Sequence, residues 1–422
     1  MRRYFILIIF IFFVFLAIPN RLALSQAKVE EIKEKIDNHN QVIKQLDEEI
    51  KKYSKEVEVV SGEAKTLQGA IKTLDVNKQK ITTEIKKTET TIKKTNLTIE
   101  QLNSEIETLE SKIDNNTSAI AKVISGINEN DNNSLIESFL SNKSISEILD
   151  EAETLNQFQQ SVREKTTELI TYKDEVSNKK GVKEGEKNNL LGFKSQLGDK
   201  NKILDINKKE KSTLLTVTKN KESEYKKLLA EKQAQKELFE KELFQFESEL
   251  KRTIDPNSFP SGKKGILAWP LDEIFVTQAF GKTSDSKRLY TSGTHNGVDF
   301  RASRGTPLKA VLDGVIQGVG NTDAQRGCYS YGKWILIKHP NGLSSLYAHL
   351  DLIKVTEGQD IKEGEIIGYS GQTGYATGPH LHLTLYASQG VEVQRYSSSK
   401  NCKNVTIPVA DRSAYLDPML YF

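Results

Sequence analysis

The C-terminal third of the chain contains a glycine-rich run that ends in two histidines, Gly371-Gln372-Thr373-Gly374-Tyr375-Ala376-Thr377-Gly378-Pro379-His380-Leu381-His382. Two shorter segments precede it, Thr294-His295-Asn296-Gly297-Val298-Asp299 and Tyr347-Ala348-His349-Leu350. Five of the six histidines lie after residue 290, and four of them belong to these segments. Neutral imidazoles with one carboxylate are the ligands of a catalytic zinc ion, which keeps one coordination position for water. The pattern therefore predicts a zinc site.

The spacing within the segments constrains how the chain must fold around such a site. His380 and His382 are two residues apart, so on a strand both side chains point to the same face. His295 and Asp299 would be about 13 Å apart in a fully extended strand. That separation is too large for two ligands of one ion. The chain must bend between them, and Gly297 allows a bend.

Residues around these segments have the pattern of a compact all-β domain, which we expect to span residues 266–422. Short β-type runs are separated by glycines throughout this region. The expected strands are Ile274–Ala279, Pro307–Leu312, Val315–Val319, Trp334–His339, Leu343–His349, Glu365–Tyr369 and His380–Tyr386.

The region from about Trp269 to Phe422 resembles the lysostaphin/LytM-type zinc metallopeptidases, which cut peptide cross-links of bacterial peptidoglycan. The family motif is H-x-x-x-D, then a lone His, then H-x-H, and all five positions are filled here in the same order. The resemblance implies that His295, Asp299 and His382 bind Zn²⁺. It also implies that His349 and His380 form the catalytic pair beside the reacting water, and it leaves open which of the two is the general base.

One position departs from the family pattern. Two residues after the H-x-H motif the family often has an acidic residue, where this chain has Thr384. If that position orients a ligand histidine from outside, the change affects the catalytic rate more than zinc binding. His339 fits no motif position and precedes a turn signal, Pro340-Asn341-Gly342, so we interpret it as structural.

Residues 26–250 have the pattern of a coiled coil. An apolar seam with alternating steps of three and four residues runs from Val29 to Ile113, and no proline occurs between Pro19 and Pro256. A break is expected near 126–154, where a cluster of Asn and Gly residues interrupts the pattern. A second, weaker arm follows from about Leu155. Two arms of similar length suggest an antiparallel hairpin within one chain, and a dimer through the first arm is the alternative.

The coiled coil has two alternative roles, a plain spacer or a docking site for a cell-division or membrane protein. Together with the peptidase-like domain it resembles the EnvC-like murein hydrolase architecture. A third hypothesis is that the coiled coil restrains the enzyme by covering the zinc cleft. The candidate covering segments are the weak seam around Lys179, Gly181 and Gly185 and the short apolar stretches between Leu135 and Leu149.

The N-terminus has the features of an export signal over residues 1–25. Arg2 and Arg3 precede an apolar run from Phe5 to Ile18, and Ala23-Leu24-Ser25 offers a cleavage site. We expect an exported protein that is periplasmic or at the cell surface, with membrane attachment only if this segment is retained. A linker rich in Pro and Gly at residues 251–265 separates the coiled coil from the β domain.

Composition narrows the function further. The 60 Lys and Arg residues nearly balance the 57 Asp and Glu residues, which argues against nucleic acid as a partner. Cys328 and Cys402 are the only cysteines, and in an exported protein they form a plausible disulfide, with two free thiols as the alternative.

The predicted function is a zinc metalloendopeptidase acting on peptidoglycan. Two rivals remain: a non-catalytic activator of a separate cell-wall amidase, and a coiled-coil scaffold that tethers division proteins. EnvC-like activators lack the zinc-site residues, whereas this chain retains every one of them, which favours an enzyme.

Overall fold

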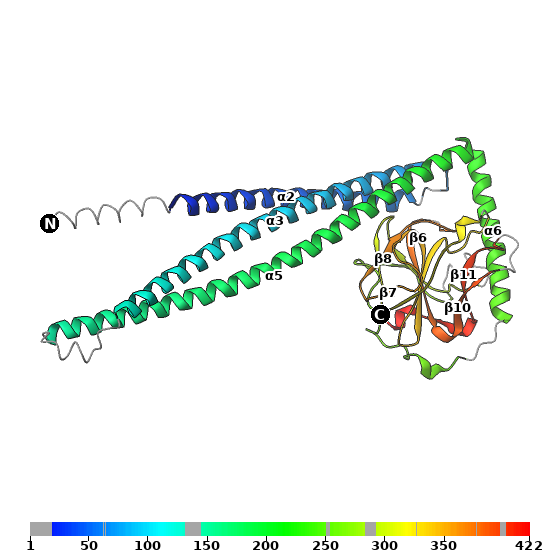
Figure 1. The fold of residues 1–422 in the computed structure, drawn as a ribbon. Coiled ribbons are helices and arrows are strands. Elements are labelled where there is room, and N and C mark those ends of the chain that lie inside the picture. The colour runs from blue at the N-terminus through cyan, green and yellow to red at the C-terminus, as the bar shows by residue number, and fades with distance from the viewer. Residues whose placement is uncertain are drawn as a thin grey trace. The chain divides into compact units, whose positions relative to one another are not determined.

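The computed structural model describes residues 19–61, 63, 65–130, 145–249, 254–282, 293–325, 327–376, 378–396 and 402–422. The chain forms a long helical N-terminal region and a C-terminal antiparallel β domain (Figure 1), which confirms the predicted fold class. It divides into two compact units, residues 1–45 with 87–196 and residues 46–86 with 197–422. Most of the expected export signal, including its apolar run, lies outside the described residues. In the part of the chain described, no helix is both long and apolar enough to cross a membrane.

The described part of the N-terminal region contains four helices: α2 (Pro19–Ser61), α3 (Leu67–Asn130), α5 (Ile145–Thr218) and α6 (Glu222–Glu249). The seam predicted one continuous first arm, but the chain turns between α2 and α3. At this turn the Thr66 hydroxyl accepts a hydrogen bond from the Gly69 amide at 3.0 Å. A Cβ at Gly69 would lie 2.0 Å from the Glu63 carbonyl oxygen, so only glycine fits. The heptad pattern hid this turn because α2 folds back and buries the same apolar stripe against α3, where Val57 and Val60 pack on Val76.

Ion pairs between α3 and α5 establish the direction of the hairpin. In one unit Lys179 pairs with Glu105, and in the other Lys200 pairs with Glu84 and Lys211 with Asp75. Residue numbers rise along α3 as they fall along α5, so the two helices are antiparallel, as expected. Helix α5 is continuous through Gly181 and Gly185, although both were expected to weaken it. The chain breaks later, where Lys219 and Asn220 adopt positive φ between α5 and α6.

The β domain is built on one large antiparallel sheet with the order β1-β2-β9-β6-β5-β4-β7; β3 pairs with β8, β8 also pairs with β6, and β12 pairs with β9. A separate ribbon pairs β10 with β11. The strands are β1 (Val276–Gln278), β2 (Val298–Arg301), β3 (Pro307–Lys309), β4 (Gly314–Asn321), β5 (Lys333–Lys338), β6 (Leu343–Ile353), β7 (Asp360–Ile361), β8 (Ile366–Ser370), β9 (His380–Ala387), β10 (Val391–Arg395), β11 (Thr406–Ala410) and β12 (Tyr415–Leu416). Each of the seven runs expected from the sequence contains or overlaps a strand. The sequence did not reveal β2, which carries Asp299.

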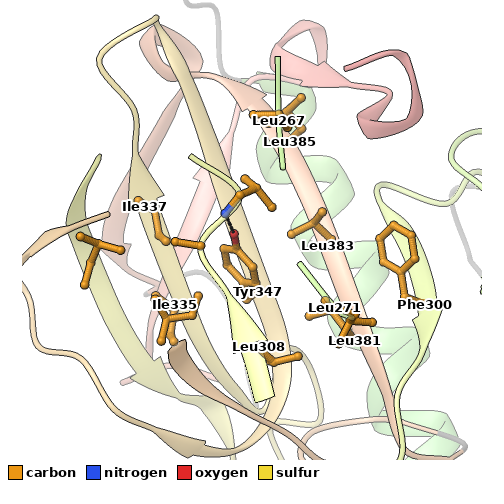
Figure 2. Close-up of a cluster of buried hydrophobic side chains, with 14 of the residues drawn as sticks. Leu267, Leu271, Phe300, Leu308, Ile335, Ile337, Tyr347, Leu381, Leu383 and Leu385 are labelled. Carbon is orange, nitrogen blue, oxygen red and sulfur yellow. Dashed lines mark hydrogen bonds between the residues drawn. The ribbon is translucent and has the colours of Figure 1, made fainter. Parts of the chain in front are cut away.

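Side-chain alternation along β9 separates the hydrophobic core from the site. Leu381, Leu383 and Leu385 point into the main core, where Figure 2 shows them with Phe300, Leu308 and Tyr347. The Tyr347 hydroxyl accepts a hydrogen bond from the Val311 amide at 2.9 Å, so this buried polar atom is satisfied. His380 and His382 alternate with these leucines and therefore project from the opposite face of the sheet.

A second apolar cluster covers that opposite face. Trp334, Leu346 and Tyr386 pack there against the β10–β11 ribbon. Helix α6 adds Phe239 and Leu243 to the same cluster (Figure 1 places α6 beside β10 and β11). Cys328 and Cys402 form a disulfide within it. The sequence pattern assigned α6 to the coiled coil, whereas in the structure its apolar face completes a layer of the β domain.

Replacing Gly320 with Ala tests the packing of this second cluster. Gly320 lies opposite Trp334 in the β4–β5 pairing, and a Cβ would lie 2.6 Å from the fully buried indole. We expect Gly320→Ala to lower the free energy of unfolding by about 1–3 kcal/mol. Gly198→Ala is the control, because Gly198 is a helical residue of α5 with no other residue within 4 Å of the added Cβ. It should leave stability unchanged or raise it by about 0.5–1 kcal/mol. Denaturant unfolding measures the free energy of unfolding of both variants. Equal values for the two variants would contradict the packing of Trp334 against Gly320.

Candidate metal centre

The pairing of β2 with β9 brings three metal-ligand side chains together. In its register Asp299 lies directly opposite His382. His295 precedes β2 and is held by a two-way backbone bridge with Gly281. The His382 Nδ1 atom lies 2.8 Å from Asp299 Oδ1 and 3.1 Å from His295 Nε2, and the latter lies 3.3 Å from Asp299 Oδ1. All three side chains are buried, and they form the one such cluster of His, Cys, Asp and Glu found among the described residues.

Gly297 is what allows His295 and Asp299 to meet. The bend between them was expected. Glycine is required at residue 297 because a side chain there would collide with strand β9. A Cβ at this position would lie 2.5 Å from the Leu383 carbonyl oxygen and 2.8 Å from the His382 ring. The backbone of this segment therefore passes directly over strand β9 next to the imidazole. Any side chain at residue 297 would push His382 away from Asp299.

Hydrogen bonds on the far side of each imidazole orient the two histidines. His295 Nδ1 lies 3.0 Å from the Ala279 carbonyl oxygen, which can only accept, so Nδ1 carries the proton and the lone pair of Nε2 faces the other two ligand side chains. His382 Nε2 lies 3.0 Å from the hydroxyl of Thr384, and its Nδ1 faces Asp299. The threonine that departs from the family pattern thus contacts a ligand histidine from outside, the position from which such partners fix the ring and its tautomer.

The electrostatics of the cluster favour a cation. Burial by itself would raise the pKa of Asp299, but hydrogen bonds with His295 and His382 hold that pKa well below its usual range. Burial lowers the pKa of His382, so its ring is neutral at pH 7. Ligand atoms of a tetrahedral zinc ion with bonds of about 2.1 Å lie about 3.4 Å apart. The three separations measured here are close to that value, so the donor set fits zinc in both chemistry and spacing.

His349 and His380 lie beside this cluster and face each other, with ring centroids 4.8 Å apart. His380 Nε2 lies 3.7 Å from Asp299 Oδ1, and the His349 ring is 5.9 Å from that of His382. His349 Nδ1 donates to the Thr373 carbonyl oxygen at 2.8 Å, and His380 Nδ1 donates to that of Gly378, also at 2.8 Å. Both histidines therefore keep Nε2 available for proton exchange.

The backbone of His349 is strained. Its φ of 64° lies in the left-handed region, which is uncommon for a residue other than glycine and is concentrated at functional sites. Its amide donates to the Tyr331 carbonyl oxygen at 2.9 Å, which holds this conformation. Burial lowers the pKa of the His349 imidazole well below its usual range, and His380 and His382 add to the effect. His349 is consequently a neutral ring that can accept a proton.

The remaining histidine of the domain is structural, as predicted. His339 lies 2.9 Å from the Asp313 carbonyl oxygen and 2.8 Å from the Ser345 hydroxyl, and it is buried. Both ring nitrogens are thus used in joining a turn to the start of β6.

The cluster opens into a cleft of about 350 Å³. One wall belongs to the β domain and includes the ligand residues, His349 and His380. The other wall is one face of α6, whose contributing residues recur at helical spacing: Lys236, Phe239, Glu240, Leu243, Phe244 and Glu247. Contacts with both rims hold the helix in place. Lys236 lies 4.6 Å from the centre of the Tyr375 ring, and Arg412 lies 4.2 Å from that of Phe244.

The end of α6 inserts a carboxyl group into a pocket of tyrosines. Glu247 is buried and accepts hydrogen bonds from the Tyr415 hydroxyl at 2.8 Å and the Ala410 amide at 3.2 Å. Burial raises its pKa to about 7, against the opposing effect of those two hydrogen bonds. The sequence analysis missed this pocket. The sequence signal for it was the helical spacing of the apolar residues Phe239, Leu243 and Phe246, just before the expected linker. These residues had been assigned to the coiled coil.

Several known proteins are similar in sequence to the β domain. The model of peptidase family M23 matches residues 293–395. The DD-carboxypeptidase/endopeptidase Mpg of Neisseria meningitidis serogroup B is 44% identical over 120 residues, which are 28% of this chain and 26% of the relative. The peptidoglycan DD-endopeptidase ShyA of Vibrio cholerae is 41% identical over 92 residues, 22% of this chain and 20% of the relative.

Among solved structures, the catalytic domain of lysostaphin from Staphylococcus simulans is 30% identical. The match covers 35% of this chain and 90% of that chain, with a TM-score of 0.26. This chain covers about a quarter of the length of the first curated relatives, 26% for Mpg. All five motif residues lie within the matched range. Residues 293–395 of this chain form a domain of peptidase family M23.

Proposed function

We propose that this protein is an exported zinc metalloendopeptidase that hydrolyses peptide cross-links of bacterial peptidoglycan. The observation that carries the proposal is the convergence of five groups on one cleft. Two imidazoles and a carboxylate present adjacent donor atoms, and two further imidazoles face each other beside them. This is the arrangement that metal-assisted hydrolysis requires, with ligands and proton-transfer groups at neighbouring positions.

His295, Asp299 and His382 would hold the ion in this proposal. A bound zinc ion supplies a Lewis acid that polarises the scissile carbonyl and makes water nucleophilic near neutral pH. The Ala279 carbonyl oxygen fixes the tautomer of His295, and the Thr384 hydroxyl contacts His382 Nε2, so that His295 Nε2 and His382 Nδ1 face the ion. Asp299 contributes the negative charge that compensates the cation in this buried place.

His349 and His380 would handle the protons. Each has Nδ1 held by a backbone carbonyl oxygen, which leaves Nε2 as the nitrogen that can exchange a proton. One accepts the proton of the attacking water, and the other stabilises the developing oxyanion or delivers a proton to the leaving amine. Both rings carry a proton on Nδ1 and can accept a second one at Nε2, so either can serve as the general base.

Peptidoglycan is proposed as the substrate because relatives over this domain are named for acting on it, such as the peptidoglycan DD-endopeptidase ShyA. Export to the periplasm or cell surface follows from the apolar N-terminal segment. The alternative, a non-catalytic activator of a cell-wall amidase, does not require the five groups to be present and mutually oriented. The coiled coil is proposed to dock a cell-division or membrane protein.

We further propose that α6 restrains the enzyme. Sequence analysis placed the covering element at residues 179–185 or 135–149. Residues 179–185 belong to continuous α5 in the other unit, and residues 135–144 lie outside the described part. Helix α6 is the better candidate, because its inner face forms a wall of the cleft, and Leu243 and Phe239 are buried against the β domain.

The first test separates metal binding from catalysis. His349→Ala in the full chain should leave one zinc ion bound per chain and lower the release of soluble muropeptides from cell-wall sacculi by about 10²-fold or more, the usual contribution of a general acid or base. His382→Ala should lose both metal and cleavage. Metal analysis by mass spectrometry and muropeptide analysis provide the two readouts. Cleavage of sacculi by His349→Ala at the wild-type rate would exclude the role assigned to this residue.

The second test concerns restraint by α6. Leu243→Asp places a charge in the buried contact and should free the helix, raising the rate of sacculus hydrolysis at least about tenfold if the docked helix blocks the substrate. Leu238→Asp is the matched control, because Leu238 belongs to the same helix and is 37% exposed. The control should hydrolyse at the wild-type rate. Equal rates for both variants, at equal zinc content, would mean that α6 is only a structural layer.

A further inference from the structure

The pocket around Glu247 has the composition of a ligand-binding site. Its donors all belong to the β domain: the Tyr415 hydroxyl and the Ala410 amide contact the carboxyl group directly. The hydroxyls of Tyr331 and Tyr386 are buried beside them and lie close to each other, and neither forms a hydrogen bond with the Glu247 carboxyl group. Burial raises the pKa of both these phenols, and the nearby Glu247 carboxyl group raises it further.

Buried hydroxyls that lack a well-formed hydrogen bond are costly, because each loses its hydrogen bonds to water without full replacement. The pocket therefore offers more donors than Glu247 uses. Arg412 adds a positive charge that favours the ionised carboxyl group. A site with an amide, three hydroxyls and a nearby guanidinium is suited to a carboxylate, which has about four lone-pair positions to satisfy.

The pocket is part of the same cleft as the metal ligands. Tyr331 and Tyr415 line this cleft together with His295, His349 and His382. The Tyr331 residue that contributes a hydroxyl also accepts the backbone hydrogen bond of His349. A peptide that passes His349 would therefore have a donor-rich pocket within the same cavity.

We propose that this pocket, formed by Tyr331, Tyr386, Tyr415 and the Ala410 amide, is a substrate subsite that binds a carboxylate of the peptide to be cleaved, and that Glu247 of α6 occupies it as a mimic of that carboxylate. The proposal rests on the peptidase function proposed above. It adds a substrate class, peptides that carry a free carboxylate close to the scissile bond.

The state of Glu247 is consistent with this role. Two opposing effects act on its pKa: burial raises it, and the hydrogen bonds from the pocket lower it. Helix α6 itself contributes to the burial of the Glu247 carboxyl group, whereas the hydrogen-bond donors belong to the β domain. When α6 leaves and water enters the cleft, the donors remain and the burial penalty falls. The open pocket then favours the ionised form of an incoming carboxyl group.

The test compares binding of two cross-linked muropeptide dimers, one with free carboxyl groups and one with all of them amidated. Calorimetry on the full chain uses a His349→Ala background, so that the probe is not consumed. Glu247→Ala opens the pocket and should bind the free-carboxyl dimer at least about tenfold more tightly than the amidated one. Adding Tyr415→Phe, which removes a donor and keeps the ring, should reduce that preference to less than about threefold.

Glu240→Ala is the matched control, because Glu240 lines the same cleft on the same face of α6 and forms an ion pair with Lys236 of that helix. It should retain the wild-type affinities for both dimers. Glu247→Gln keeps the size of the side chain and covers the case in which Glu247→Ala does not fold; its weaker docking should show the same preference for free carboxyl groups. Equal affinities for the two dimers in both Glu247 variants would overturn the subsite. Cleavage is measured separately with His349 restored, so a chain that prefers the carboxylate without cutting would refute the peptidase function and leave the subsite standing.

Discussion

The contact between Asp299 and His382 across the β2–β9 pairing is the constraint on which the rest of the site depends. The register places the two residues opposite each other, with 2.8 Å between the carboxylate oxygen and Nδ1. Everything else in the centre serves this contact. Gly297 leaves room for it, Thr384 turns the imidazole so that Nδ1 faces the carboxylate, and the bridge between Gly281 and His295 brings in the third ligand. A shift of one residue in this register would send His380 and His382 into the core and the leucines of β9 into the cleft.

The alternation of side chains along β9 also links the hydrophobic core to the helix, α6, that lines the cleft. One face of β9 builds the main core shown in Figure 2, and the other carries His380, His382 and Thr384 and then Tyr386. Tyr386 belongs to the second apolar cluster, which α6 helps to complete. A helix that covers apolar surface also lines the cleft and fills the tyrosine pocket with Glu247. Stability and access are consequently coupled: whatever displaces α6 opens the cleft and at the same time exposes Tyr386 and its neighbours.

Much of this could be predicted from the sequence, because histidine is rare here and the motif order is specific. Residue types and spacing predicted a zinc site, and the resemblance to LytM-type peptidases implied the roles of the five residues; the structure places all five around one cleft. The need for a bend before Asp299 also followed from strand dimensions. Its cause did not, because the contact of Gly297 with His382 joins residues 85 positions apart in the chain.

The coiled-coil region shows a different limit of sequence reasoning. A heptad pattern indicates which face of a helix is buried, but it does not identify the helix or strand that packs against that face. The turn between α2 and α3 and the assignment of α6 to the β domain both preserve an apolar stripe, so neither interrupts the pattern that the sequence displays. The role of Glu247 was hidden for the same reason, since a single glutamate among the charged residues of a helix carries no signal of burial.

The most direct test of the central claim is anomalous X-ray scattering at the zinc absorption edge from crystals of the full chain grown with zinc. Our account predicts one strong peak per chain, about 2.0–2.2 Å from His295 Nε2, Asp299 Oδ1 and His382 Nδ1. It also predicts no peak at that place in crystals of Asp299→Asn. A zinc ion bound elsewhere in the domain, or none at the three side chains, would contradict the account of this cleft as a metal-dependent hydrolytic site.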